Sequence, residues 1–380
     1  MLQVAAFCLS AVVSGALFWR WKRLDLGAKK IVWRFYGWFS GLMCCGSCCG
    51  AVAWAAWMQV IVYRLKSDDM GRIAGTQNVT SVQKSQFAES LLFLAGDFEF
   101  LSLFTVMKEL EFFFLCAAKL LVLDRLKHVA VPKSKTSSRG WVVGARIVMG
   151  CFVAGNAVGL GGSIAAAVYA NQVTRFAYQT AAAVIANDTS NSQQLLENLR
   201  SALTRTSRAY SVYAFSEVAV LMFIVASFVV VGTLCASRMR SALDHMDHDA
   251  GAANTQQLRH EFMKVRKQIF GTVITVFLTF VLRAVYQTMF GLQLALQSDF
   301  SNFSSCGGYA GFCDSACYNV FFLMKQWDLY TPEFHPLVIL ISSPLTMLLT
   351  LWAMTTERAL QLLLGRQRPA ADLVTLAQLG

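Results

Sequence analysis

The stretch at residues 209–236, AYSVYAFSEVAVLMFIVASFVVVGTLCA, decides the fold, because Glu217 is its only charged residue. A helix needs ~20 predominantly apolar residues to cross the hydrocarbon core of a membrane. This stretch is therefore predicted to be a membrane-spanning helix. The whole chain is 56% hydrophobic and only 14% charged, a composition that is typical of membrane proteins and not of soluble domains.

Six more apolar runs meet the same length criterion. They lie near residues 1–19, 38–63, 87–123, 141–170, 269–296 and 336–356. The sequence thus predicts an all-α integral membrane bundle of about seven transmembrane helices, which occupies residues 1–356. The remaining residues, 357–380, form a tail that contains both leucines and arginines. Leu360, Leu363 and Leu364 stand on the face opposite Arg358, Arg366 and Arg368, which predicts a short amphipathic helix lying on the membrane surface.

The basic residues indicate the orientation of the chain. The segments 20–37, 124–140 and 237–268 and the tail together hold 20 Lys and Arg, whereas the alternate loops hold 9. Because cytoplasmic loops carry an excess of Lys and Arg, the N-terminus is expected outside and the C-terminus in the cytoplasm. The net charge of +11 is then a topology signal, so the lipid bilayer is an expected partner and nucleic acid is not.

The loops assigned to the outside carry further signals. Three glycosylation sequons fall in them, at Asn78, Asn187 and Asn302. One outside loop also holds Cys306, Cys313 and Cys317, which are candidates for a disulfide in an oxidising compartment. The loop at 171–208 has a helical apolar pattern, so the fourth and fifth spans are expected to continue outward as a helical hairpin.

The protein is expected in the plasma membrane or an endomembrane.

Several polar residues interrupt the predicted spans at a similar depth. Charges inside a membrane cost about 2.5–3.5 kcal/mol each on insertion scales, so each needs a partner or a cavity. At ~1.5 Å per residue from the cytoplasmic end of each span, these residues lie ~20 to ~28 Å deep. The residues of this polar layer are Lys108, Glu109, Glu111, Asn156, Glu217 and Arg283.

Two interpretations of the polar layer remain open. Lys108 and Glu111 are spaced to face each other on one helix, which leaves Glu109 or Glu217 as a candidate counter-ion for Arg283. The layer is either a ligand pocket or an ion or proton path, or it is a fully paired network that only holds the bundle together.

Motifs for catalysis or cofactor binding are missing. The five histidines fall in loops or at span edges, and no HExxH motif is present. We therefore expect no catalytic residues, no metal and no cofactor, and the protein is not expected to be an enzyme. The pairs Gly46 with Gly50, and Gly155 with Gly159, have the GxxxG spacing that lets membrane helices approach closely, and they are expected to serve packing.

Seven spans, an outside N-terminus, a basic third cytoplasmic loop and an amphipathic helix after the last span resemble the plan of G-protein-coupled receptors. Span three ends in Asp124, Arg125 and Leu126, which looks like the Asp-Arg-Tyr element of that superfamily. By this resemblance, Asp124 and Arg125 are candidates for a cytoplasmic switch. The segment 277–286, FLTFVLRAVY, is similar to span six of the tobamovirus-multiplication-protein family of seven-helix proteins.

The sequence departs from the main receptor class in span seven, which offers Ser343, Pro344 and Met347 where Asn-Pro-x-x-Tyr is expected. The hypothesis is a receptor-like seven-helix bundle that transduces a signal across a membrane, with an unknown ligand and a cytoplasmic signalling partner. One alternative is a transporter or channel that uses the charged layer. The other is a structural or scaffold membrane protein without catalytic activity.

Overall fold

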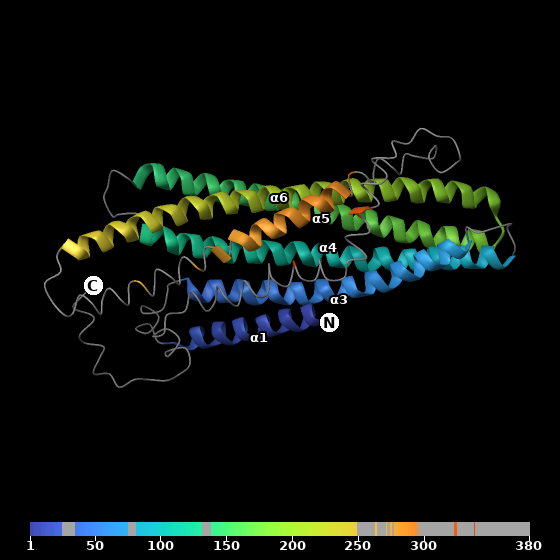
Figure 1. Cartoon of the computed structure of the whole chain (residues 1–380). Coiled ribbons are helices and arrows are strands. Elements are labelled where there is room, and N and C mark those ends of the chain that lie inside the picture. The colour runs from blue at the N-terminus through green and yellow to red at the C-terminus, as the bar shows by residue number, and fades with distance from the viewer. Residues whose placement is uncertain are drawn as a thin grey trace.

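The described part of the chain is built only of helices and the short links between them. The computed structural model describes residues 1–24, 35–74, 81–130, 138–248, 263, 271, 274–275, 277–293, 295, 323–324 and 338. The helices are α1 (Leu2–Arg23), α3 (Tyr36–Ala74), α4 (Ser81–Ala130), α5 (Ser138–Ile185) and α6 (Thr189–His248) (Figure 1). Residues 277–293 form a further helical segment.

Five of these helices are long and apolar enough to cross a membrane. The predicted all-α architecture is therefore confirmed for the described residues, and the five long apolar helices are consistent with a multi-pass membrane protein. The first five predicted spans overlap α1, α3, α4, α5 and α6. Part of the sixth lies in the segment 277–293, whereas the seventh lies outside the described residues except for Val338, which is buried.

The helices are longer than the hydrophobic runs indicate. Helix α4 has 50 residues and α6 has 60, which correspond to ~75 and ~90 Å at ~1.5 Å per residue. The hydrocarbon core of a bilayer is only ~30 Å thick. Both helices therefore continue well beyond the membrane, whereas the 22 residues of α1 span little more than the membrane itself. Figure 1 accordingly shows the N-terminus part way along the bundle.

A tight turn joins α5 to α6 and confirms the predicted helical hairpin. Asn187, two residues after the end of α5, has a positive φ of 59°, a conformation that asparagine adopts more readily than most residues. Asp188 then caps α6, because its carboxylate accepts a hydrogen bond from the backbone N–H of Asn191 at 3.2 Å. From α4, the Lys84 ammonium donates a hydrogen bond to Asn187 Oδ1 at 2.9 Å.

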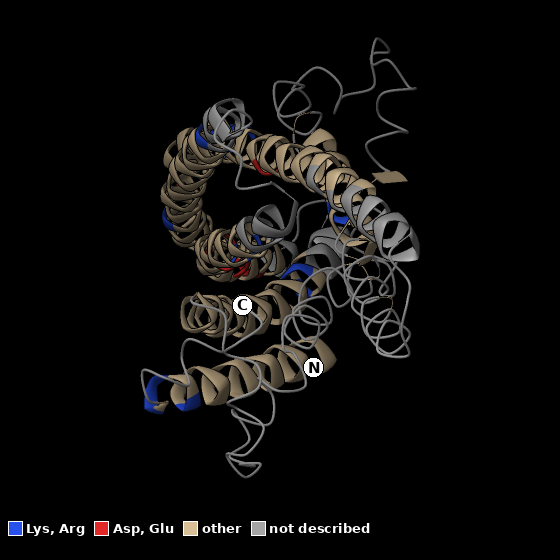
Figure 2. Ribbon diagram, turned by 90° about the vertical axis from the view of Figure 1, so that its left-hand side faces the viewer, with Lys and Arg blue, Asp and Glu red and all other residues tan. Residues whose placement is uncertain are grey.

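The helices pack in a continuous series, with α1 on α3, α3 on α4, α4 on α5 and α5 on α6, while α4 also touches α6. Figure 2 shows α1 at the edge of the bundle. The main core includes Trp54, Phe112, Tyr213 and Phe280. A second cluster, the tip module, joins α4, α5 and α6 near the α5–α6 turn. Its buried residues are Ala88, Leu91, Ala95, Val173, Ala177, Ala181, Leu199 and Ala202.

Exposed apolar side chains mark the membrane-facing surface. On α5 they are dense between Ile147 and Val168, and on α6 between Val212 and Leu234. These two bands are ~32 and ~33 Å long at ~1.5 Å per residue, which matches the ~30 Å hydrocarbon core. The α5 band contains no charged residue, and the α6 band contains only Glu217, which is buried. In Figure 2 most of the described ribbon is tan, the colour of residues other than Lys, Arg, Asp and Glu.

The GxxxG glycines lie where helices meet. A Cβ on Gly46 would approach Leu115 of α4 at 2.8 Å, and a Cβ on Gly50 would collide with Phe7 of α1. On α5, Gly155 faces Val220 of α6 in the same way. The expectation that these pairs serve packing within the bundle is confirmed for these contacts, since the missing side chains allow the helices to approach closely.

Candidate functional site

The structure brings the predicted polar layer together inside the bundle. All six of its residues are buried, with side chains on α4, α5, α6 and the segment 277–293. Asn156 lies nine residues into the exposed apolar band of α5, which is ~14 Å at ~1.5 Å per residue. The layer therefore lies within the membrane-facing part of the molecule.

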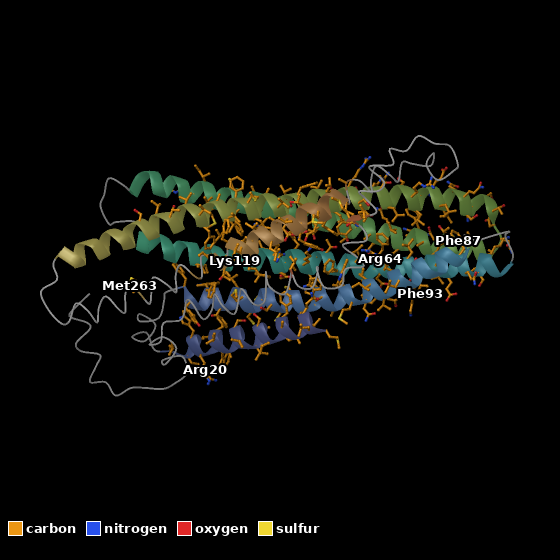
Figure 3. All side chains as sticks on the ribbon, viewed as in Figure 1. Arg20, Arg64, Phe87, Phe93, Lys119 and Met263 are labelled. Atoms are coloured by element: carbon orange, nitrogen blue, oxygen red, sulfur yellow. The ribbon has the colours of Figure 1, made fainter. Side chains whose placement is uncertain are left out.

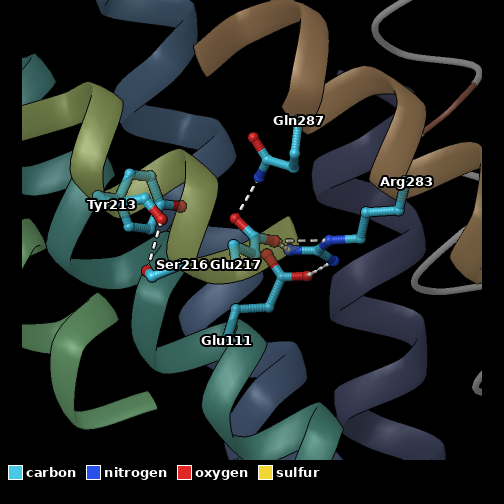
Figure 4. A network of polar contacts seen from close by, with 6 residues as sticks. All are labelled: Glu111, Tyr213, Ser216, Glu217, Arg283 and Gln287. Atoms are coloured by element: carbon cyan, nitrogen blue, oxygen red, sulfur yellow. Dashed lines mark hydrogen bonds and ion pairs between the residues drawn. The ribbon is translucent and has the colours of Figure 1, made fainter. Parts of the chain in front are cut away.

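An ion bridge centred on Arg283 joins three helical elements. Its Nη2 lies 2.8 Å from Glu217 Oε1 of α6, and its Nε donates a hydrogen bond to the same oxygen at 2.9 Å. Its Nη1 lies 3.5 Å from Glu111 Oε1 of α4. Gln287, one turn further along, donates a hydrogen bond to Glu217 Oε2 (Figure 4). Of the two predicted counter-ions for Arg283, Glu109 and Glu217, it is Glu217 that contacts the guanidinium group. Glu111 contacts it as well.

The Lys108 ammonium lies in a cage of aromatic rings. Its Nζ is 5.5–6.0 Å from the centroids of four rings, which come from α4, α6 and the segment 277–293. The rings belong to Phe104, Tyr213, Tyr286 and Phe290. Ring faces attract cations most strongly where water is excluded, so this cage stabilises a charge that would be costly in the membrane.

Two other buried cations lie against rings. Arg283 stands over Phe112 at 5.1 Å, and Lys119 stands over Phe280 with its Nζ 4.0 Å from the centroid. Lys119 is itself buried. It lies ~16 Å from Lys108 along α4 at ~1.5 Å per residue, two turns or more from the polar layer.

Glu109 points from α4 toward α5. A Cβ added to Gly159 would lie 2.7 Å from Glu109 Oε1 and 3.1 Å from Ser216 Oγ, so glycine leaves room for this carboxyl group. Only 2% of Glu109 is exposed, and its Oε2 has no hydrogen-bond partner among the described residues. Asn156 lies three residues before Gly159. It donates to Phe152 O at 2.8 Å, while its Oδ1 lacks a partner in the described part.

Among the residues that the structure describes, the layer is therefore incompletely paired. Buried polar groups in proteins are usually hydrogen-bonded, and each exception needs an explanation. In the described chain, Glu109 Oε2, Asn156 Oδ1 and Gln287 Oε1 are all buried acceptors without a donor. The layer also contains three carboxylates and two cations among the described residues, so one more positive charge would balance it.

Sequence reasoning missed a second ionic contact between the polar layer and the tip module. Arg64 of α3 and Asp97 of α4 form a two-point pair, with distances of 3.1 and 3.3 Å, and Asp97 is almost fully buried. Figure 3 shows Arg64 closer than Lys119 to the tip. The signal was Asp97, a carboxylate inside the apolar run 87–123 that was not included in the predicted polar layer. Its partner, Arg64, falls in a predicted loop, because the second span was expected to end at residue 63.

A buried hydroxyl pair lies between these two ionic contacts. Thr105 Oγ1 and the Tyr210 hydroxyl are 2.6 Å apart, and Ser163 Oγ donates to the Thr105 carbonyl at 3.3 Å. These contacts link α4 to α6 and to α5. Nothing in the sequence spacing indicated them, because all three partners lie on different helices.

The remaining predicted sites are only partly described. Asp124 and Arg125 lie in α4, six and five residues before its end at Ala130, and their side chains fall outside the described residues. Asn187 lies in the α5–α6 turn and is exposed. The other glycosylation and disulfide candidates lie outside the described residues: Asn78, Asn302, Cys306, Cys313 and Cys317.

Other classes of site find no support in the described chain. Within it, no group of three or more His, Cys, Asp or Glu side chains is placed to hold a metal ion. No family model, curated protein or solved structure matches the chain. The proposal that follows therefore depends on the geometry of the helices and the polar layer.

Proposed function

We propose that the protein is a receptor-like membrane protein, which passes a change at the tip module to the opposite, cytoplasmic ends of its helices. One observation carries this proposal: α4 and α6 run without a break from the tip module, through the polar layer, to the far end. A packed helix moves as a rigid element. A displacement at the tip would therefore appear at the other end.

The ion bridge is the element that such a displacement would act upon. It holds α4, α6 and the segment 277–293 together through one guanidinium group. An unpaired buried charge is costly. A half-broken contact is therefore unfavourable, and such an ion pair is either formed or replaced by another pairing. Two arrangements of this bridge would give the bundle two states, which a ligand at the tip module could favour unequally.

The unpaired acceptors distinguish this proposal from a purely structural role. A network that only holds helices together would be expected to satisfy its own polar atoms. Here Glu109 Oε2 and Asn156 Oδ1 are buried without a donor in the described chain. We take this as support for a layer that changes state. The cytoplasmic partner would bind near Asp124 and Arg125, and the orientation follows the excess of basic residues on that side.

The experiment fixes the tip module with a crosslink and measures the distance between α5 and α6 at the opposite end of the bundle. A covalent crosslink between positions 84 and 187, which already meet through a hydrogen bond, would fix α4 to the α5–α6 turn. Spin labels at exposed Arg146 and Leu234 would report the distance between α5 and α6 at the opposite end in lipid nanodiscs. We expect the clamp to narrow that distance distribution, and Glu217→Gln to abolish the effect.

An unchanged distance distribution after clamping would contradict the proposal. The transporter alternative is tested by measuring ion current across sealed vesicles that contain the protein, under an applied potential. A receptor is expected to carry no current. A current that Arg283→Gln abolishes would favour the transporter instead.

A further inference from the structure

Glu109 is the acidic group that the ion bridge does not use. Arg283 contacts Glu217 and Glu111, and the Lys108 ammonium is held among four rings. In the described chain Glu109 has no ion pair, and its Oε2 has no hydrogen-bond partner. A carboxylate that is buried in a membrane without a partner is costly, and a bound cation removes that cost.

The surroundings of Glu109 favour the smallest cation. Its carboxyl group lies against Gly159 and close to Ser216 Oγ, where even a methyl group would be too close. The Ser216 hydroxyl donates to the Tyr213 carbonyl at 2.7 Å and so keeps its oxygen available as an acceptor. The unpaired Asn156 Oδ1 lies one turn away on α5. A protonated Glu109 would bring a hydrogen-bond donor into this group of acceptors.

The charges around Glu109 link its protonation state to the stability of the ion bridge. The groups that act on it most strongly are Glu217 on α6, Arg283 on the segment 277–293 and Lys108 on its own helix. Neighbouring α5 contributes the uncharged Asn156 and Gly159, and α3 has no charged residue between Tyr36 and Arg64. A negative Glu109 would repel Glu217 and compete with it for Arg283, whereas a neutral Glu109 would leave the bridge undisturbed.

We propose that Glu109 is a proton-binding site, and that binding of one proton there stabilises the bridge between Arg283, Glu217 and Glu111. The reaction is the conversion of the Glu109 carboxylate to a carboxylic acid, with the proton taken from water. The site goes beyond the proposed receptor role and does not depend on it, since a transporter or a structural protein could bind the same proton.

The test observes the proton directly. Infrared spectra of the purified protein in lipid at neutral pH are expected to show the carbonyl stretch of a protonated carboxylic acid, shifted in heavy water. Glu109→Gln should abolish this band. Glu99→Gln, which removes an exposed carboxyl group on the same helix, should keep it. Persistence of the band in Glu109→Gln overturns the proposal, and so does its absence from the wild-type protein.

Two further measurements keep the test decisive. Glutamine imitates a protonated glutamate, so Glu109→Gln should keep the melting temperature of the wild type at neutral pH, while Glu217→Gln should lower it. Equal losses in the two variants would show that Glu109 acts as a buried anion and would overturn the proposal. Replacing Na⁺ by choline at constant pH should leave the band unchanged, and a band that appears only without Na⁺ would assign the site to Na⁺ instead.

Discussion

Replacing Arg283 by methionine is expected to lower the free energy of unfolding by about 3–5 kcal/mol, because it leaves two buried carboxylates without their counter-ion. Arg283 contacts both Glu217 and Glu111 and is itself buried. Methionine fills much of the same volume, so the loss measures the charge and not a cavity. Thermal unfolding of the purified protein in detergent micelles reads the effect as a lower melting temperature.

The control for Arg283 is Arg200→Met, since Arg200 is an exposed residue of α6. Its effect is expected to stay within about 0.5 kcal/mol. The triple variant Arg283→Met, Glu111→Gln, Glu217→Gln should recover most of the loss, because no buried charge of the bridge then remains unpaired. If Arg283→Met and Arg200→Met unfold at the same temperature, the ion bridge does not form as described.

Two glycines of α5 are expected to respond to alanine with opposite signs. At Gly155 the added methyl group would collide with Val220, which is buried on α6 and has a stiff, β-branched side chain. Such overpacking typically costs about 1–3 kcal/mol. At Gly161 the nearest neighbours of a Cβ lie beyond 4 Å. Alanine there should stabilise the helix by up to ~1 kcal/mol.

The same unfolding assay compares the two glycine variants, each of which adds one methyl group to the same helix. A lower melting temperature for Gly155→Ala and an equal or higher one for Gly161→Ala would place the α5–α6 contact at Gly155. Two variants with the same response would contradict that contact, because the helix propensity of both positions is the same.

The sequence predicted the membrane architecture because apolar length is a local property. The band from Val212 to Leu234 is visible in the chain itself, and it matches the exposed surface of α6. The ends of the helices were harder to place. Helix α3 continues through Arg64 to Ala74, beyond the apolar run that ends at residue 63. Its extension is stabilised by contacts such as Arg64 with Asp97 on α4, and no local pattern shows them.

The polar layer was predicted as a set of residues but not as a set of contacts. Spacing placed Lys108 and Glu111 on one face of α4, and depth along each span placed Glu217 near Arg283. The aromatic cage around Lys108 draws on α6 and the segment 277–293, and only the packing of those elements brings the rings together. Gln287 could have been anticipated, because it lies four residues after Arg283 and so shares its face of a helix.

The receptor role requires the tip module to face outside and the far end of α4 to face the cytoplasm. Tags on each terminus, tested in intact and permeabilised cells, measure this directly, together with an endoglycosidase shift that Asn187→Gln should reduce. We expect the N-terminal tag to be accessible in intact cells, the C-terminal tag only after permeabilisation, and a glycan on the exposed Asn187. An N-terminal tag that is reached only after permeabilisation, with no glycan on the protein, would contradict the receptor role.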